Sequence, residues 1–377
     1  MSAPVSDLTY LTPPQLARDL AVRDLSDPAE GPHAIQVLID TAVQTLSRAW
    51  GCDVRWCRGT RIVPVADNYD RLNYPADSIT RETCYTRYAS ADRMLRSHST
   101  AMVPPALRGL AADPADSDGD VLLVCPGIVY RRDAIDWQHT GTPHQLDLWR
   151  VTRRPASGKD MTDMIAILLA ALVPGMPWRR LPRSHPYTRN GWQVDVRHDG
   201  RWVEVWECGQ AHPGVLAAAG LRHHSGLALG MGLDRVLMIA KGVPDIRLLR
   251  SADPRIARQM LGLAPYQRVS VMPAITRDLS VTVSGEEDEE TLGDRVRDAL
   301  GTDARCVEEV RVLSTTAYER LPAAAIARLG ARPGQRNLLV RVTLRDLDAT
   351  LTNEAANRLR DRIYAALHEG TRYEWSA

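Results

Sequence analysis

The segment 123–151 most constrains what this chain can fold into. Two runs rich in β-forming residues, 127–132 and 144–151, flank a polar loop. Strand-forming runs that enclose a turn-forming segment are typical of a β-hairpin. The sequence therefore predicts a long antiparallel hairpin, with a polar connection between its strands.

Successive side chains of a strand point to opposite faces of the sheet, so each run presents one polar row. The two rows are Val129, Arg131 and Asp133 in the first run, and Gln145, Asp147 and Trp149 in the second. A guanidinium beside carboxylate and amide groups suits a ligand that carries both a phosphate and an amine. The alternative is an exposed hairpin with solvated charges.

The two runs also resemble a known motif. Residues 130–133 (Tyr-Arg-Arg-Asp) and 144–147 (His-Gln-Leu-Asp) resemble motif 2 of the class II aminoacyl-tRNA synthetases of the phenylalanyl type. The resemblance implies that Arg131 holds the α-phosphate of ATP and places Asp133 among the ATP-binding residues. It also implies that Gln145 and Asp147 hold the α-amino group of the amino acid, although the family usually has Glu where this chain has Asp147.

A second block of the chain carries the same resemblance. Residues 94–100 (Met-Leu-Arg-Ser-His-Ser-Thr) resemble the family's block in which a His and a Ser approach the amino acid. His98 and Thr100 take these roles here, and Val103 stands where the family has Gln. Without the family context, a single His would more often be a surface residue or a hydrogen-bonded core residue.

The expected amino-acid pocket departs from the family at several positions. His185 and Tyr187 stand where the family has two Phe residues that pack against the substrate ring, while the small Ala228 is retained. Glu207 and Gln210 replace Gly and Met beside the same pocket. Polar groups there fit a purely benzyl ligand poorly, because buried polar groups need partners. The alternative is that both side chains point away from the pocket.

A second hairpin is predicted over 193–207, with Asp199-Gly200 as a type I′ turn. Counting back from this turn pairs Asp195 with Glu204, and like charges placed opposite each other repel. Mg²⁺ bound through these carboxylates and ATP phosphates would relieve the repulsion. The alternative is that one carboxylate becomes protonated or turns to solvent.

Residues 225–235 resemble motif 3, a strand that passes through glycines into a helix. Glycines such as Gly232 let the backbone approach the nucleotide closely, and Arg235 near the helix start can meet the γ-phosphate. Elsewhere, apolar periodicity predicts helices over 33–50 and 160–173. Residues 107–120 are polar and rich in turn-forming residues, which predicts a surface insertion.

Composition narrows the class of protein. Lys and Arg number 47 against 46 Asp and Glu, so no overall basic field indicates a nucleic-acid partner. No apolar run approaches about 18 residues, so we expect no membrane span. The six cysteines are scattered without a CxxC pair, which favours reduced thiols and a cytoplasmic location.

Phenylalanine is absent, although the chain has 11 Tyr and 9 Trp. Ordinary usage would give on the order of a dozen Phe residues in a chain this long. Nucleotide bias does not explain this, because Tyr codons are no richer in G and C than Phe codons. Either selection has removed Phe codons, or the sequence was deliberately recoded.

We expect an α+β protein of four segments. They are an N-terminal peripheral arm (1–30), a class II synthetase catalytic domain with an antiparallel sheet (31–262), a linker (263–272) and a ferredoxin-like α/β sandwich (273–377). The last segment resembles the anticodon-binding domain of single-chain, organelle-type phenylalanyl-tRNA synthetases. Its acidic residues outnumber its arginines, so charge gives no support for RNA binding there.

The resemblance implies ATP- and Mg²⁺-dependent activation of phenylalanine, or of a more polar relative, as an aminoacyl-adenylate. Transfer to a tRNA of the phenylalanine type would follow, with Arg131 and Arg235 neutralising the reacting phosphate. We expect a specialised, Phe-free paralogue acting as a monomer or homodimer without a separate second subunit. Two other functions stay open: a tRNA-independent ligase that passes the adenylate to a small amine, and a non-catalytic RNA-binding regulator.

Overall fold

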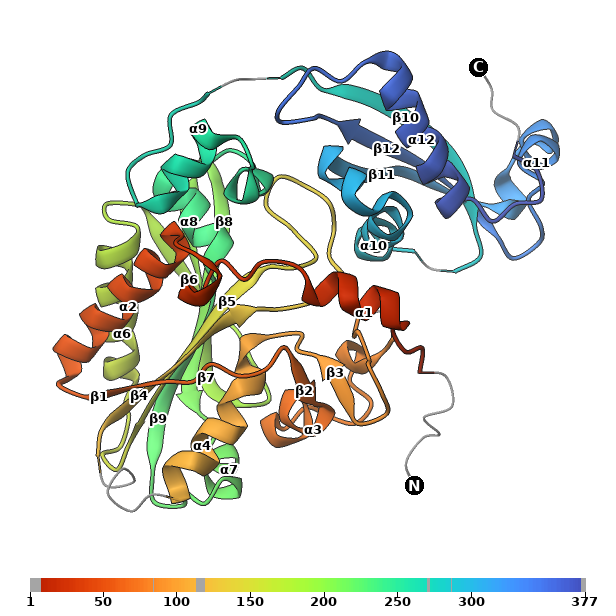
Figure 1. The fold of residues 1–377 in the computed structure, drawn as a ribbon. Coiled ribbons are helices and arrows are strands. Elements are labelled where there is room, and N and C mark those ends of the chain that lie inside the picture. Colours follow the sequence, from red (N-terminus) through yellow and green to blue (C-terminus); the bar gives the residue numbers. More distant parts are fainter. Residues whose placement is uncertain (1–7, 84, 113–118, 270–271, 286, 374–377) are drawn as a thin grey trace. The chain divides into compact units, whose positions relative to one another are not determined.

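The computed structural model describes residues 8–83, 85–112, 119–269, 272–285 and 287–373. Figure 1 shows the order of the helices and strands along the chain. Contacts divide the chain into two units. The first consists of Met1–Arg131, Thr142–Val243 and Gln259–Tyr266, and the second of Arg132–Gly141, Pro244–Arg258 and Gln267–Ala377. The predicted domain boundaries stay predictions, because this division gives two inner segments of the expected catalytic domain to the second unit.

The first unit is built on a seven-stranded sheet of order β1-β4-β5-β9-β8-β7-β6. Its strands are β1 Asp53–Trp56, β4 Val121–Ile128, β5 His144–Thr152, β6 Trp178–Pro182, β7 Thr188–His198, β8 Arg201–Ala211 and β9 Ser225–Gly232. All neighbours are antiparallel except the parallel pair β1 and β4. The expected antiparallel sheet is confirmed.

Helices cover both faces of this sheet. Those of the first unit are α1 Pro13–Leu20, α2 Ala34–Trp50, α3 Val65–Asn68, α4 Val103–Ala112, α6 Gly158–Leu172, α7 Pro213–Ala218 and α8 Leu233–Lys241. In Figure 1, α2 and α6 lie along one face, and α4 and α7 lie by the other. The helices predicted over 33–50 and 160–173 are therefore confirmed. Gly51 ends α2 with φ 63°, a left-handed conformation that glycine adopts without strain.

The first predicted hairpin forms, but its first strand lies earlier than expected. β4 begins at Val121 and ends at Ile128, and it pairs with β5. The residues of β4 are buried on both faces, so its continuous apolar run is the strand. Arg131 and Asp133 consequently lie beyond the strand end, in the connection, and strand alternation does not orient them.

Two other expectations about the first unit need correction. Residues 107–112 belong to α4, where Leu107 and Leu110 are buried, so the surface insertion does not start at 107; residues 113–118 lie outside the described part. The segment 22–30 is not peripheral, because Leu25 and Ser26 are almost fully buried. A short two-stranded sheet of β2 (Ile62–Pro64) and β3 (Arg93–Leu95) completes this unit.

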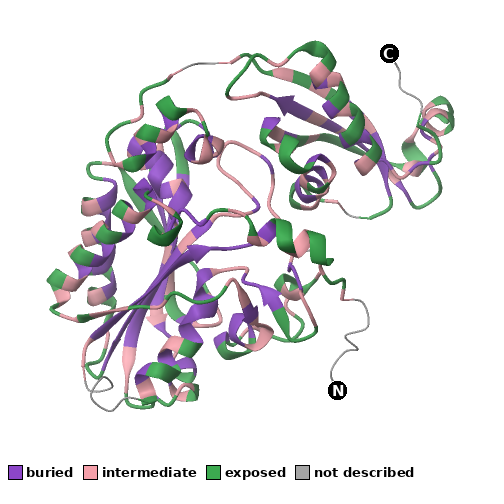
Figure 2. Ribbon diagram, in the orientation of Figure 1, coloured by how far each residue is buried: buried purple, intermediate pink, exposed green. Residues whose placement is uncertain are grey.

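From residue 275 onward, strands and helices alternate in the described part of the second unit. Its main elements are β10 Ile275–Val283, α10 Glu289–Leu300, β11 Val307–Ala317, α11 Ala323–Leu329, β12 Arg336–Leu344 and α12 Asn353–Leu367, preceded by α9 Pro254–Ala257. The strands form an antiparallel sheet of order β10-β12-β11. Leu292 and Val296 of α10 and Ile363 of α12 pack on it to form one apolar core. Figure 2 colours the buried residues of the ribbon purple.

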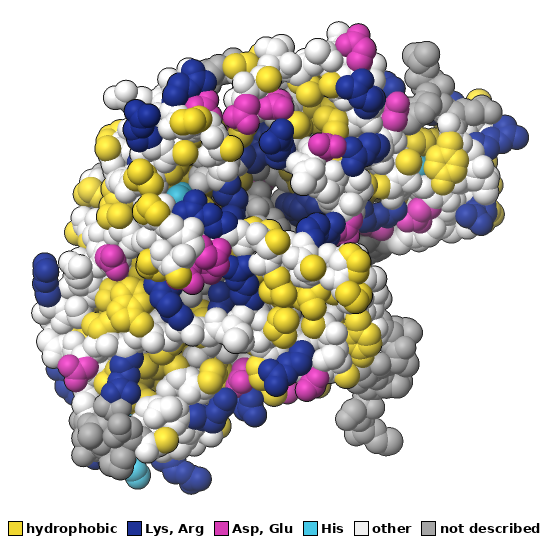
Figure 3. All heavy atoms as spheres, in the orientation of Figure 1, with side chains coloured by type: hydrophobic (Ala, Val, Ile, Leu, Met, Phe, Trp, Pro, Cys, Tyr) yellow, Lys and Arg dark blue, Asp and Glu magenta, His cyan; other side chains and the backbone are white. Residues whose placement is uncertain are grey.

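Charges of both signs are interspersed on the face of the molecule that Figure 3 shows. This agrees with the nearly balanced composition. Among the helices of the described residues, none combines the length and the apolarity that crossing a membrane requires.

Candidate active site

Strand register brings most of the predicted site residues to one face of the seven-stranded sheet. Asp147 of β5 pairs with Gly230 of β9, and Gly230 pairs with Glu207 of β8. Residues directly opposite each other in neighbouring strands point to the same side. We call this side the site face. Asp147 and Glu207 are two strand spacings apart on it, roughly 10 Å along the hydrogen-bonding direction.

A β-bulge adds Glu204 to the site face. The predicted pairing of Asp195 with Glu204 is confirmed, and the register between β7 and β8 shifts by one residue next to it. Simple alternation would place Glu204 and Glu207 on opposite faces. Because the extra residue of the bulge, Val205, shifts the alternation, both carboxylates lie on the site face.

Gln210 lies on the other face. Gln210 pairs with Leu227, and Leu227 pairs with Arg150 of β5. Arg150 directly follows Trp149 in β5, so its side chain points away from the site face. The Gln210 amide donates to the Ala156 carbonyl oxygen at 2.9 Å and accepts from Asn190 at 2.9 Å. These contacts correct the expectation that Gln210 binds the amino acid: its polar atoms hold the ends of two loops.

The centre of the site face is a buried carboxylate with three donors. The Ser99 hydroxyl donates to Asp147, Thr100 Oγ1 donates to it at 3.1 Å, and Trp149 Nε1 donates at 3.3 Å. The Ser99 N–H donates to Gln145 Oε1 at 3.1 Å. Gln145 and Asp147, the two residues predicted to bind the amino group, are therefore both hydrogen-bonded to Ser99. Burial raises the pKa of Asp147 to about 6, although the three donors oppose the shift.

Trp149, which donates to this carboxylate, belongs to a set of five rings in contact. We call them the aromatic cluster: Tyr74, His98, Trp149, His185 and Tyr187. Tyr187 stacks on His185 at 5.3 Å between centroids and on Trp149 at 6.1 Å, and Tyr74 lies 6.1 Å from Tyr187 and 5.8 Å from His98. Burial, with Arg131 nearby, lowers the pKa of His98 to about 3, so its imidazole is neutral. The predicted residues His98, His185 and Tyr187 therefore come together.

Ser99, Tyr74 and the role of Trp149 were missed from the sequence. Trp149 follows Asp147 by two residues on one strand, so alternation alone placed it on the site face. Ser99 stands between two residues that were identified. Tyr74 gives no local signal, because only the tertiary fold brings it against His98.

An ion-paired group lies at one side of the aromatic cluster. Glu207 Oε2 is 2.6 Å from His185 Nε2, and Glu207 Oε1 is 2.8 Å from Arg183 Nε. Burial raises the pKa of Glu207, but His185 and Arg183 outweigh it and hold the pKa below its usual range. Glu207 is therefore ionised at neutral pH, on the site face.

Asp195 does not need a metal ion to relieve the charge repulsion from Glu204. Arg179 Nε donates to one Asp195 oxygen at 2.8 Å, and Gln193 Nε2 donates to the other at 2.8 Å. This corrects the expectation that Asp195 ligates Mg²⁺, since an arginine already neutralises it. Among the described residues, no group of three or more His, Cys, Asp and Glu side chains is arranged to hold a metal ion.

Glu204 remains the carboxylate that fits a metal–nucleotide complex. Burial, with a contribution from Glu207, raises its pKa. A buried carboxylate with a second acidic group nearby favours a divalent cation, and Mg²⁺ takes one or two carboxylates together with substrate phosphates. The donor set of this chain therefore fits Mg²⁺ held jointly by Glu204 and ATP.

The two predicted phosphate-binding arginines lie in the first unit. Arg131 is exposed immediately after β4, and it acts electrostatically on His98. Arg235 lies in the first turn of α8, which follows Gly232, and its Nη1 donates to the Glu204 carbonyl oxygen at 3.1 Å. Asp133 belongs to the second unit, where its carbonyl oxygen accepts from Arg297. A contact of Asp133 with ATP stays a prediction.

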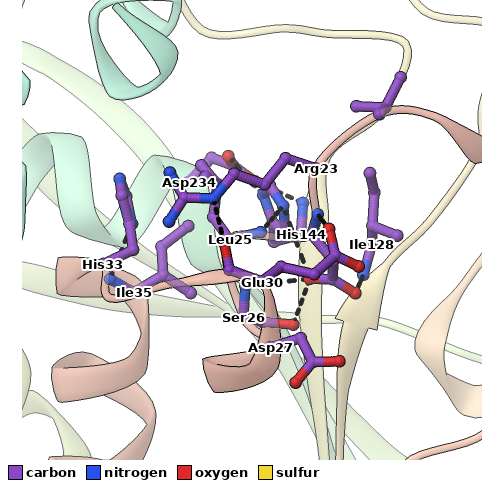
Figure 4. Close-up of polar contacts among 12 residues, drawn as sticks. Arg23, Leu25, Ser26, Asp27, Glu30, His33, Ile35, Ile128, His144 and Asp234 are labelled. Carbon is purple, nitrogen blue, oxygen red and sulfur yellow. Dashed lines mark hydrogen bonds and ion pairs between the residues drawn. The ribbon is translucent and has the colours of Figure 1, made fainter.

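A buried polar network connects motifs 2 and 3 (Figure 4). His144 Nδ1 lies 2.9 Å from Asp234 Oδ1, and His144 Nε2 accepts the Leu25 N–H at 3.0 Å. Because Nε2 accepts, the proton is on Nδ1 and is donated to Asp234. Asp24 in turn accepts the Ile128 N–H at 3.0 Å. Through these contacts, Asp24 and Leu25 of the N-terminal segment fix the start of β5, which carries Gln145, and the start of α8, which carries Arg235.

Replacing His144 with alanine should lower the free energy of unfolding by about 3 kcal/mol. The change leaves the buried Asp234 carboxylate without its imidazole donor and removes a fully buried ring. Urea unfolding followed by tryptophan fluorescence measures the difference. The exposed His223 provides the control, since its alanine variant should stay within about 0.5 kcal/mol of the parent. Equal effects of the two variants would show that the network does not stabilise the fold.

Comparisons with known proteins agree with this geometry. A family model described as "tRNA synthetases class II core domain (F)" matches residues 22–260, well over half of the chain. The phenylalanine–tRNA ligase alpha subunit of Prochlorococcus marinus (strain MIT 9313) is 33% identical over 227 residues, which cover 59% of this chain and 64% of that relative.

Two relatives match a larger share of the chain. The chloroplastic/mitochondrial phenylalanine–tRNA ligase of Arabidopsis thaliana is 27% identical over 317 residues, covering 80% of this chain and 68% of the relative. The mitochondrial phenylalanine–tRNA ligase of Dictyostelium discoideum is 24% identical over 353 residues, covering 78% of this chain and 72% of the relative. The chain spans less than two thirds of the length of the cyanobacterial relative.

Proposed function

The chain belongs to the class II tRNA synthetase core family, and from this premise we propose that it activates a phenylalanine-type amino acid with ATP and transfers it to a tRNA. The observation that carries the proposal is the buried Asp147 on the site face, held by Ser99 and Thr100. Arg131 lies close enough to His98, the residue before Ser99, to lower the pKa of its imidazole. An ammonium binder beside a phosphate binder is the arrangement that amino-acid adenylation requires.

In the proposed first step, Asp147 and Gln145 hold the α-ammonium group and leave the α-carboxylate toward the nucleotide. A carboxylate oxygen attacks the α-phosphorus of ATP, the bond from that phosphorus to the bridging oxygen breaks, and pyrophosphate leaves with the electron pair. Arg131 stabilises the charge on the α-phosphate, and Arg235 holds the γ-phosphate. Mg²⁺, held with Glu204, would neutralise the departing pyrophosphate.

Transfer to tRNA is the second half of the proposal. The Arabidopsis and Dictyostelium relatives, named phenylalanine–tRNA ligase with no subunit designation, match about four fifths of this chain. This supports a chain that works without a separate second subunit. The five described cysteines are free thiols, which is consistent with a reducing, cytoplasmic compartment.

The proposal is tested by charging of tRNA. The purified chain is incubated with ATP, the amino acid and total tRNA, and acylated species are resolved on acidic denaturing gels. We expect acylation of a tRNA of the phenylalanine type. Adenylate formation without acylation of any tRNA would contradict transfer and indicate a tRNA-independent ligase.

We also propose that the absence of Phe codons belongs to the function. A chain with no phenylalanine can be completed when charged phenylalanine tRNA is scarce or mischarged. The cellular level of this protein should therefore stay constant during phenylalanine limitation. The levels of Phe-containing proteins with similar turnover should fall. Pulse labelling during limitation measures this, and an equal fall would contradict the proposal.

Amino-acid binding should weaken as the pH falls below about 6. Burial raises the pKa of Asp147 to about 6, so its carboxylate is ionised above that pH and protonated below it. Only the ionised form attracts the α-ammonium group, so the KM for the amino acid should rise up to tenfold per pH unit below 6. A KM that stays constant between pH 7.5 and 5 would show that Asp147 does not bind the amino group.

A further inference from the structure

The deep end of the site face is filled by the chain's own side chains. Trp149 pairs with Ala228, and Ala228 pairs with Gly209. These two small residues leave space above the sheet. Trp149 is fully buried in the apolar cluster that contains Ala228, and a Cβ on Gly209 would lie 2.8 Å from the Thr188 Cβ. The space is therefore occupied by Trp149 and Thr188.

The rings of the aromatic cluster are also in contact with one another. Their neighbouring centroids lie 5.3 to 6.1 Å apart. Aromatic pairs in direct contact have centroid separations of about 4.5 to 7 Å, so no further ring fits between these neighbours. A bound side chain must instead lie against the partly exposed residues Tyr74, His185 and Tyr187.

The ionised carboxylate of Glu207 lies next to His185 of the aromatic cluster. Glu207 lies on the site face in the same row as Asp147, and each of its oxygens has one nitrogen partner, from His185 or Arg183. An ionised carboxylate accepts at about four lone-pair positions. Two positions therefore remain for other donors. An apolar side chain placed here would displace water from them and leave them unsatisfied.

We propose that Glu207 and His185 select an amino acid whose side chain carries a hydrogen-bond donor, a hydroxyl or an amino group, over one with an unsubstituted benzyl group. The inference rests on the proposed function and names the substrate class of that site. A site built to hydrogen-bond a substrate group discriminates strongly against analogues without it. Because Glu207 keeps two protein partners, we expect a moderate preference in kcat/KM, about 100-fold.

Amino-acid-dependent ATP–pyrophosphate exchange tests this preference with the full chain. The substrates are phenylalanine, tyrosine, 3-hydroxyphenylalanine, 4-aminophenylalanine and the other proteinogenic amino acids. The best donor-bearing substrate should exceed phenylalanine about 100-fold in kcat/KM. Calorimetric binding of the same amino acids without ATP should give the same order of affinities.

Three variants identify the residues responsible. Glu207→Gly should reduce the preference to less than about fivefold, and Glu207→Gln, which keeps one acceptor oxygen, should retain an intermediate preference. His185→Phe combined with Glu207→Gly should turn the preference toward phenylalanine. Gln210→Met on the opposite face of the same strand is the matched control, and it should leave the preference unchanged.

The outcomes separate the two claims. Phenylalanine used as well as every donor-bearing amino acid, with no change in Glu207→Gly, would overturn this inference and leave the proposed function standing. Exchange with none of the amino acids would overturn the proposed function, and this inference with it. A preference that Glu207→Gly abolishes and Gln210→Met preserves supports both.

Discussion

Replacing Arg131 with alanine should lower kcat/KM for amino-acid-dependent pyrophosphate exchange about 1,000-fold. Arg131 is exposed three residues beyond the end of β4 and acts electrostatically on His98 of the aromatic cluster, and we propose that its guanidinium meets the charge that develops on the α-phosphate. Removing one such donor costs about 10² to 10³ in rate, and a charged donor lies at the upper end. Arg131→Lys keeps the charge but loses the two-pronged geometry, so we expect a loss of about 10- to 100-fold.

The exposed Arg189 on β7 offers a matched control for this prediction. Arg189→Ala removes the same charge from the same unit, away from the site face, and should retain exchange within about twofold of the parent. If Arg131→Ala retained more than a tenth of the parent activity, Arg131 would not be the α-phosphate ligand. Unfolding curves of both variants distinguish lost chemistry from lost folding.

The Asp147→Asn variant should lose amino-acid affinity and gain stability. An ionic partner of a buried ammonium is worth roughly 3 kcal/mol, so the KM for the amino acid should rise about 100-fold while the KM for ATP changes little. Without a bound amino acid, the same ionised carboxylate lowers the free energy of unfolding. Its pKa is about 6 in the folded chain against an ordinary value of 3.8, so its ionised form destabilises the fold.

The sign of the stability change follows from this shift. The destabilisation is complete above the folded pKa of about 6, and it disappears as the pH falls toward 3.8. At pH 7.5, Asp147→Asn should therefore be more stable than the parent by about 1 to 3 kcal/mol. Urea unfolding at pH 7.5 and pH 5 measures this difference. A variant that is less stable than the parent at pH 7.5 would contradict the assignment.

Local sequence patterns predicted the elements that depend on local physics. The helix α2 followed from apolar spacing, and the β7–β8 hairpin followed from its Asp199-Gly200 turn. Both turn residues adopt positive φ, 46° and 77°, as a type I′ turn requires. The pairing of Asp195 with Glu204 then followed by counting along the strands.

Features that depend on register and tertiary contacts could not be predicted in this way. The bulge at Val205 decides that Glu204 and Glu207 share a face, and strand alternation alone gives the opposite answer. The partners of Asp195 and Gln210, Arg179 and Ala156, come from other elements. Resemblance to a family indicated which residues to examine, and only the fold showed which of them face the ligand.

Adenylate formation by this chain is tested most directly by ATP–pyrophosphate exchange with the purified protein in the presence and absence of amino acids. We expect exchange that requires an amino acid and is lost in Arg131→Ala. The KM for the amino acid should rise in Asp147→Asn. Exchange that is absent with every amino acid, or that is unaffected by both substitutions, would contradict these expectations.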